Sequence, residues 1–326
     1  MAPRPSPALR PPSRFPRVVL VAVIAILAAF GAVPLAQAAV QASPAPQAAA
    51  EPVRAGVKPI HPAGFQAAKG NTLAVGSSAS TGVVSPHPKV FLVFWGSQWS
   101  KDPAGAAADL QKFFKGLFGS ADNWGTIMNQ YCEGVPKGTT TCGSAGIHIQ
   151  HPTASTLGGV WFDNSAAAPG KASATQLGNE AVKAAQHFGN TSQTPNLNAQ
   201  YVIASPTGTH PDGFNTPSGG FCAWHSSMGS SVGTVAFTNL PYVPDTGKGG
   251  CTTLSNARLL DGYESTETHE YAETITDFFP AKGWNGGGGE IGDECQNLDR
   301  RIKLSTGTFD VQGLWSNDLN KCVTSE

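Results

Sequence analysis

Continuous runs of apolar residues predict the strands of this chain. The run KVFLVFWG (89–96) is β-branched and aromatic throughout, a pattern typical of a strand buried on both faces. Similar short runs predict further strands at 146–150, 159–162, 200–205, 221–225 and 233–240. The segments IKLS and TFDVQGLW flank Thr306–Gly307 and predict a hairpin near the C-terminus.

Four other segments have the composition and spacing of helices: 103–118, 121–131, 174–188 and 255–279. Gly189 is a stop signal for the third helix, and Gly262 is a point of interruption in the fourth. The long last helix follows an antiparallel-looking pair of strands. We therefore predict a single, disulfide-stabilised α+β domain with a mixed β-sheet. The same order of elements occurs in zincin-like domains, in which the metal-binding helix follows the sheet; this is an analogy of fold.

The first 88 residues differ from the rest of the chain. Residues 1–38 combine four arginines, no acid, an apolar run (18–30) and the small residues AQA, which predicts a secretory signal peptide. The apolar run is shorter than the roughly 20 residues of a membrane span. We thus expect a secreted protein without membrane attachment after cleavage; an uncleaved anchor is the alternative. Residues 39–88 are rich in Ala, Pro, Ser and Gly and predict a linker or pro-segment, so the domain would span 89–326.

Charge and cysteine content narrow the class of protein. Loss of the four arginines changes the formal net charge from −1 to −5, which argues against nucleic acid and anionic membranes as partners. Six cysteines suit an oxidising compartment. Pairing of neighbours predicts Cys132–Cys142, Cys222–Cys251 and Cys295–Cys322, one of fifteen possible connectivities.

The predicted helix near the C-terminus contains the sequence HEYAE, residues 269–273. His269 and Glu273 are four residues apart, so their side chains are neighbours on the helix surface and could bind one ion. Zinc peptidases use H-E-x-x-H in this way, and the glutamate after the first histidine activates the metal-bound water. Glu270 occupies that base position, and Glu273 stands where the second histidine would be.

The distribution of charge strengthens a metal hypothesis. Residues 261–299 contain ten of the 22 acidic residues, and no basic residue lies between Arg258 and Lys282. Such a cluster calls for a cation, since like charges on one helix face repel. Histidine with carboxylate ligands suits Zn²⁺, whereas an all-oxygen cluster would suit Ca²⁺. For the third ligand we prefer Glu290, then Asp293, which follow a glycine-rich turn, and then Asp277.

Several other interpretations compete with the metal site. The acids could simply form the solvated face of an amphipathic helix, opposite a side formed by Tyr271, Ala272, Ile275, Phe278 and Phe279. His225 could donate a hydrogen bond to a developing oxyanion, or it could be a structural histidine. Paired carboxylates and seven tryptophans would also suit a glycosidase. No nucleophile elbow, which joins a strand to a helix, is predicted around the serines at 226–231, so a serine hydrolase is not supported.

Four stretches, at 90–99, 221–227, 260–279 and 314–322, give the chain a distant resemblance to the EXORDIUM, or phosphate-induced, secreted proteins. That resemblance implies an extracellular or cell-wall location and growth-related roles. Plant members lack the histidine and both glutamates of HEYAE. Microbial secreted proteins with H-E-x-A-E-x-x-T-D followed by G-E-I-G-D look like closer relatives. These resemble metallopeptidases, which places His269 and Glu273 as ligands and Glu270 as base.

Two hypotheses follow from the sequence. In the first, the protein is a secreted zinc endopeptidase with a polypeptide substrate, in which His269, Glu273 and Glu290 or Asp293 bind the metal. Glu270 and His225 then assist the hydrolysis. In the second, it is a non-catalytic, wall-associated protein whose acidic cluster is structural or binds Ca²⁺.

Overall fold

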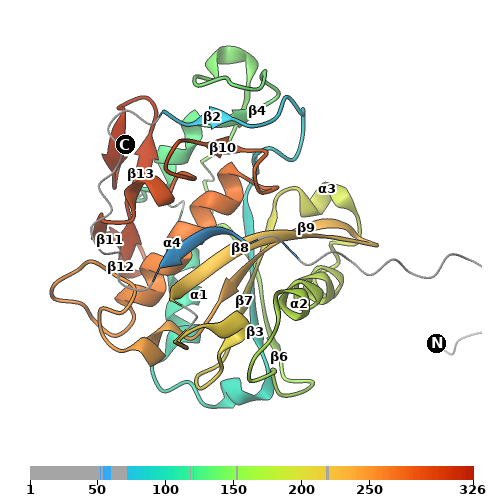
Figure 1. The fold of residues 1–326 in the computed structure, drawn as a ribbon, viewed down its shortest axis with the longest axis vertical. Coiled ribbons are helices and arrows are strands. Elements are labelled where there is room, and N and C mark those ends of the chain that lie inside the picture. Colours follow the sequence, from blue (N-terminus) through green and yellow to red (C-terminus); the bar gives the residue numbers. More distant parts are fainter. Residues whose placement is uncertain are drawn as a thin grey trace, which may run out of the picture. The chain divides into compact units, whose positions relative to one another are not determined.

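A six-stranded mixed sheet organises the described part of the chain, which in the computed structural model comprises residues 52, 54–59, 72–117, 119, 121–151, 153–217 and 220–326 (Figure 1). The strand order is β1 (Ala55–Pro59), β8 (Phe221–Ser230), β9 (Gly233–Leu240), β7 (Ala199–Ala204), β3 (Lys89–Trp95) and β6 (Leu157–Asp163). Four strands, β6, β3, β7 and β9, are parallel neighbours in that order. Strand β8 is antiparallel to both β9 and β1. The predicted α+β class with a mixed sheet is confirmed.

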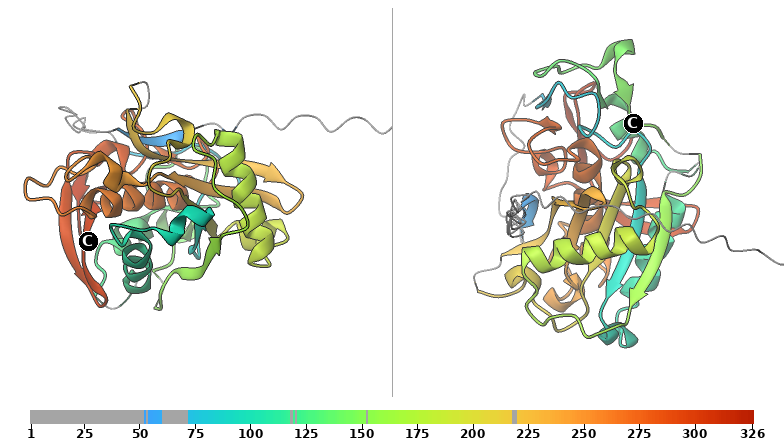
Figure 2. Two further views of the ribbon diagram at one scale, coloured as in Figure 1. Left: turned by 90° about the horizontal axis from the view of Figure 1, so that it is seen from below. Right: turned by 90° about the vertical axis from the view of Figure 1, so that its right-hand side faces the viewer.

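Helices cover both faces of this sheet (Figures 1 and 2). Helix α2 (Ala174–His187) packs on one face, while α1 (Ala106–Gly116) and α4 (Asp261–Thr276) pack on the other. The alternation of strand side chains explains the two layers. In β3, Leu92 and Phe94 belong to the apolar cluster with α1 and α4, and Val93 belongs to the cluster with α2. A strand buried on both faces therefore needs the continuous apolar run that its sequence contains.

Short hairpins surround this frame. The hairpin of β11 (Asp299–Leu304) and β12 (Gly307–Gln312) lies against α4, as Figure 1 shows in red and orange. The other small elements are β2 (Ala74–Val75) with β10 (Trp284–Asn285), β4 (Cys132–Glu133) with β5 (Ile147–His148), β13 (Leu314–Ser316) with β14 (Lys321–Val323), and the short α3 (Gln193–Asn196).

All three predicted disulfides are present: Cys132–Cys142, Cys222–Cys251 and Cys295–Cys322. Each joins residues at most 29 apart in the sequence. The third disulfide fixes the turn that follows the glycine-rich segment, close to α4. Disulfides of this kind persist in extracellular or other oxidising compartments.

The folded part of the chain begins before residue 89, so the predicted boundary is wrong. Strand β1 belongs to the main sheet, and Leu73, Val75, Val83 and Val84 are buried in the core. Composition misled the prediction because a few apolar side chains suffice for a segment that adds to an existing sheet and core. The predicted signal peptide, residues 1–38, lies outside the described residues. Where the structure describes the chain, no helix has the length and apolar character needed to cross a membrane.

Two helix predictions need correction. Residues 121–131 contain only a short 3₁₀ segment, Gly125–Gln130, because Asp122 Oδ1 accepts hydrogen bonds from the amides of Trp124 and Gly125 and starts a tight turn there. Gly262 does not interrupt the last helix. It lies in the first turn of α4, where an added Cβ would come within 3.2 Å of the Cys251 amide nitrogen. The glycine therefore permits close packing on the Cys222–Cys251 disulfide.

Candidate metal centre

Helix α4 is enclosed on all sides. Each of its 16 residues is buried, including His269 and the glutamates 264, 267, 270 and 273. The sheet strands β8 and β9 cover one side, and β12 covers another. The interpretation of these acids as the solvated face of an amphipathic helix is therefore wrong. Carboxyl groups of this kind are rarely buried unless they are paired or bind a metal.

His269, Glu273 and Asp293 bring three possible ligand atoms within 4.8 Å of one another. His269 Nε2 lies 3.1 Å from Glu273 Oε2 and 3.8 Å from Asp293 Oδ1. The first two residues are one helical turn apart on α4. Asp293 reaches them from a short 3₁₀ turn, Asp293–Cys295, which the disulfide to Cys322 holds in place.

The turn that carries Asp293 is attached directly to α4. Glu273 Oε1 accepts hydrogen bonds from the amides of Gly292 and Asp293, at 3.2 and 2.9 Å. A Cβ on Gly292 would lie 2.7 Å from His269 Nδ1 and 2.9 Å from Glu273 Oε1, so only glycine allows this approach. One carboxylate oxygen of Glu273 thus holds the backbone, and the other, Oε2, faces His269.

Gln312, at the end of β12, fixes the orientation of His269. Its side-chain amide donates to the carbonyl oxygen of Gly292 at 2.8 Å, so its Oε1 must accept from His269 Nδ1, 3.2 Å away. The ring proton is therefore assigned to Nδ1, and the lone pair of Nε2 faces Glu273 and Asp293. Burial lowers the pKa of His269 to about 4, which keeps the ring neutral at physiological pH.

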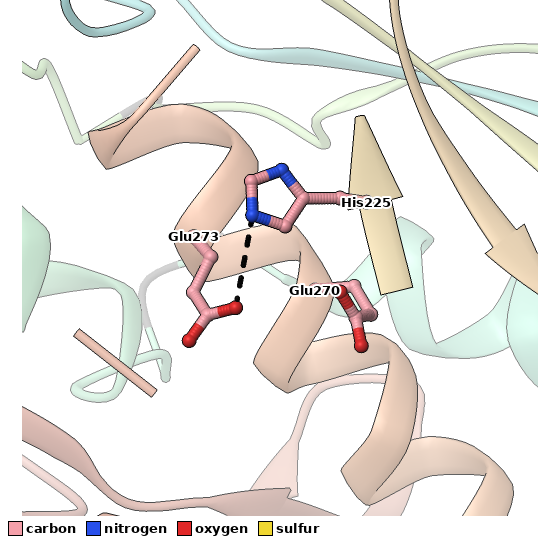
Figure 3. A group of neighbouring side chains, drawn as sticks. All are labelled: His225, Glu270 and Glu273. Atoms are coloured by element: carbon pink, nitrogen blue, oxygen red, sulfur yellow. Dashed lines mark ion pairs between the residues drawn. The ribbon is translucent and has the colours of Figure 1, made fainter. Parts of the chain in front are cut away.

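A second set of side chains adjoins the first through Glu273. His225, on β8, lies with Glu270 and Glu273 within the same 4.8 Å limit (Figure 3). His225 Nε2 is 3.8 Å from Glu273 Oε2 and 2.8 Å from Glu290 Oε2. Burial disfavours the imidazolium ion, but the adjacent Glu290 carboxylate outweighs it and raises the pKa of His225 to about 9.

Among the described residues, several ligand-type atoms at this place have no hydrogen-bond partner. They are Nε2 of His269, Oε2 of Glu273, both carboxyl oxygens of Glu270 and Nδ1 of His225. All four side chains are fully buried. Burial, together with the neighbouring carboxylate of Glu273, raises the pKa of Glu270 well above its usual range. Unpartnered atoms that converge in the interior are costly unless something binds them.

The structure separates the three candidates for a third ligand. Asp293 joins His269 and Glu273, whereas Glu290, the first preference from sequence, is bonded to His225. Asp277 lies outside both groups. Its carboxylate accepts from the amides of Ala281, Lys282 and Gly283 and from the Asn285 side chain, so it stabilises the turn after α4.

Sequence reasoning missed Gln312. A signal was present, because strand alternation in TFDVQ places Asp310 and Gln312 on one side and Phe309 and Val311 on the other. Both polar residues are fully buried. Polar residues on the side of a strand that packs on an acidic helix can hold the side chains of that helix in place, as Gln312 does for His269.

Comparison of the chain with protein-family models, curated proteins and solved structures gives no match. The case for a function therefore depends on the geometry of the site itself.

Proposed function

We propose that the protein is a metal-dependent hydrolase that binds Zn²⁺ through His269, Glu273 and Asp293. One observation supports this most directly: His269 Nε2 and Glu273 Oε2 are fully buried, face each other and have no hydrogen-bond partner in the described part of the chain. A cation would satisfy both atoms and would offset the negative charge of the cluster. Three protein ligands leave one tetrahedral position open, as in catalytic zinc sites.

The donor set favours zinc over calcium. Each of the two groups contains one imidazole nitrogen and two carboxylates. Calcium takes six to eight oxygen ligands and does not use imidazole, whereas zinc combines imidazole with carboxylate. The hydrogen bond from His269 Nδ1 to Gln312 is the kind of support that metal-bound histidines normally have.

Glu270 and His225 have properties suited to hydrolysis. A bound zinc ion would lower the pKa of a coordinated water and polarise a carbonyl oxygen. Glu270, whose oxygens have no partner among the residues that the structure describes, is the proposed proton acceptor for that water. His225 is charged at neutral pH because of Glu290, and its Nδ1 has no partner among the same residues. A cationic N–H donor at this place would stabilise the negative oxygen that develops in acyl transfer.

We further propose a polypeptide substrate, an endopeptidase activity and a zincin-like relation between sheet and helix. The sheet strand β8 carries His225 beside the ligand helix α4, and a sheet edge suits an extended peptide. The three disulfides and the N-terminal sequence support secretion. The resemblance to EXORDIUM proteins points to the same location, and HEYAE, which plant members lack, points to chemistry that they do not perform.

Metal analysis of the purified mature protein tests the proposal. We expect about one zinc per chain for the unsubstituted protein, and its loss in His269→Ala. At a free zinc concentration of 100 times the Kd, the metal should stabilise the fold by about 2.7 kcal/mol, measured as a shift in thermal unfolding. Glu267→Gln is the matched control, because Glu267 is equally buried on α4 but belongs to neither ligand group.

Two outcomes would contradict the proposal. If the folded protein binds no transition metal and His269→Ala unfolds as the unsubstituted protein does, the cluster is structural and the EXORDIUM-like alternative is favoured. If calcium binds and zinc does not, the ligand assignment is wrong.

A further inference from the structure

We propose that the outer edge of β8 is the substrate-binding edge, that it selects an extended polypeptide with a basic side chain, and that β1 occupies it as a built-in competitor. This inference rests on the proposed peptidase function and adds a substrate class to it. Lys58 of β1 stands in for the basic side chain of the substrate, and Asp299 is the residue that selects it.

Strand β1 lies on β8 as an added peptide would. It is antiparallel to β8, with Ala55 opposite His225, Lys58 opposite Ala223 and Pro59 opposite Phe221 (β1 is the blue strand in Figure 1). Backbone hydrogen bonds of this type bind extended peptides with little dependence on sequence. Pairing is irregular, with two register shifts within β1, whereas β8 and β9 pair without a shift from Trp224 to Ser230.

The position of β1 places it against the candidate metal centre. It contacts α4 and the turn Asp293–Cys295, and its residue Ala55 is the register partner of His225. A peptide bound in the same place would therefore run past the residues assigned to hydrolysis. The strand that occupies this edge therefore lies next to the candidate centre.

The side chain of Lys58 supplies the specificity. Only 1% of it is exposed, and its Nζ donates to Ser265 Oγ at 2.5 Å and lies 3.7 Å from Asp299 Oδ1. Ser265 in turn donates to the same oxygen of Asp299. A lysine is almost never buried so completely without a partner. These residues form an acidic pocket for an ammonium or guanidinium group, built from α4 and β11 and not from β1.

Peptide binding to the full-length chain tests the inference without depending on catalysis. The probe is a fluorescent peptide of residues 52–60, PVRAGVKPI, and the same peptide with glutamate at the lysine position. Binding is measured by anisotropy in the presence of a chelator. In the Lys58→Glu chain, the glutamate opposes Asp299, so β1 should leave the edge.

We expect the lysine peptide to bind Lys58→Glu at least about 10-fold more tightly than the unsubstituted chain, since β1 no longer competes. We also expect the glutamate peptide to bind Lys58→Glu at least about 10-fold more weakly than the lysine peptide does. Lys89→Glu is the matched control, because Lys89 is an exposed lysine of the same sheet, and it should bind like the unsubstituted chain.

Equal binding of the two peptides, or equal binding to the two chains, would overturn the inference. Lys58→Met removes the charge without adding repulsion. It shows whether any loss of folding in Lys58→Glu is caused by that repulsion. If both Lys58 variants lose the thermal unfolding transition, β1 is an integral strand and the inference is also overturned. Peptide binding without zinc-dependent cleavage would support the inference and contradict the proposed function. Cleavage without a preference for basic side chains would support the proposed function and contradict the inference.

Discussion

Two buried acids of α4, Asp261 and Glu270, lie in opposite environments. In the first turn, Asp261 accepts from the amide and the guanidinium of Arg258, each at 2.6 Å, and is also bonded to Arg301. Despite burial, these partners lower the pKa of Asp261 below its usual value. Two to three turns later, Glu270 is equally buried, and neither of its oxygens has a hydrogen-bond partner where the structure describes the chain.

The difference supports a structural role for Asp261 and underlies the functional role proposed for Glu270. A carboxylate whose partners are present stabilises the fold, and nothing further is needed to explain it. A carboxylate without partners in the described part of the chain, close to the equally unpartnered Glu273 Oε2, raises the free energy of the folded chain. Buried groups with perturbed pKa values gather at functional sites, and the raised pKa of Glu270 meets that description.

The largest expected effect comes from substitution of Glu270. Glu270→Gln keeps the size of the side chain but removes its ability to accept a proton. We expect peptide hydrolysis to fall on the order of 100- to 10,000-fold, with zinc content unchanged. Activity and metal content are measured on the same samples. If Glu270→Gln retains full activity, or loses zinc, Glu270 is not the base and the contrast with Asp261 has no catalytic meaning.

Local sequence patterns were sufficient for several elements and for the proximity of His269 and Glu273. Apolar runs and stop signals located β3, β7, β9 and α2, which ends before Gly189, whose φ is +78°. The spacing of HEYAE placed His269 and Glu273 on one side of a helix, and their side chains do lie together there. These features depend on residues a few positions apart, where the period of a helix or strand determines which side chains meet.

Features that depend on packing were not predictable. A helical wheel shows which side chains share a face, but it cannot show that β12 covers the polar face of α4. The choice between Glu290 and Asp293 depended on a turn whose backbone is held by Glu273. Strand β1 was missed because its few apolar residues give little periodic signal, and only the edge of β8 makes it a strand.

Removal of the group that orients His269 should have a smaller effect. Gln312→Leu leaves the ligands intact but takes away the acceptor for His269 Nδ1–H. We expect zinc affinity to fall about 10- to 100-fold, as for other partners of metal-bound histidines. Competition with a chromophoric chelator measures the affinity. Gln98→Leu is the control, because its side chain bonds to the backbone of Ala168 and, among the described residues, to none of the proposed ligands. Equal losses of zinc affinity in both variants would point to general destabilisation of the fold.

The smallest effect is expected for substitution of Asp261. Asp261→Asn should lower the free energy of unfolding by about 1.5 kcal/mol at neutral pH, the low end for hydrogen bonds to charged groups. The low end applies because Arg258 and Arg301 are 47% and 24% exposed and regain water. The pKa of Asp261 is lower in the folded chain than its usual 3.8, so its contribution is present above that value and is lost as pH falls through the folded pKa. Denaturant titrations of both proteins, with and without zinc, measure the difference. The difference in the free energy of unfolding should become smaller on acidification and should not depend on zinc. A zinc-dependent difference would mean that Asp261 and the candidate metal centre are coupled.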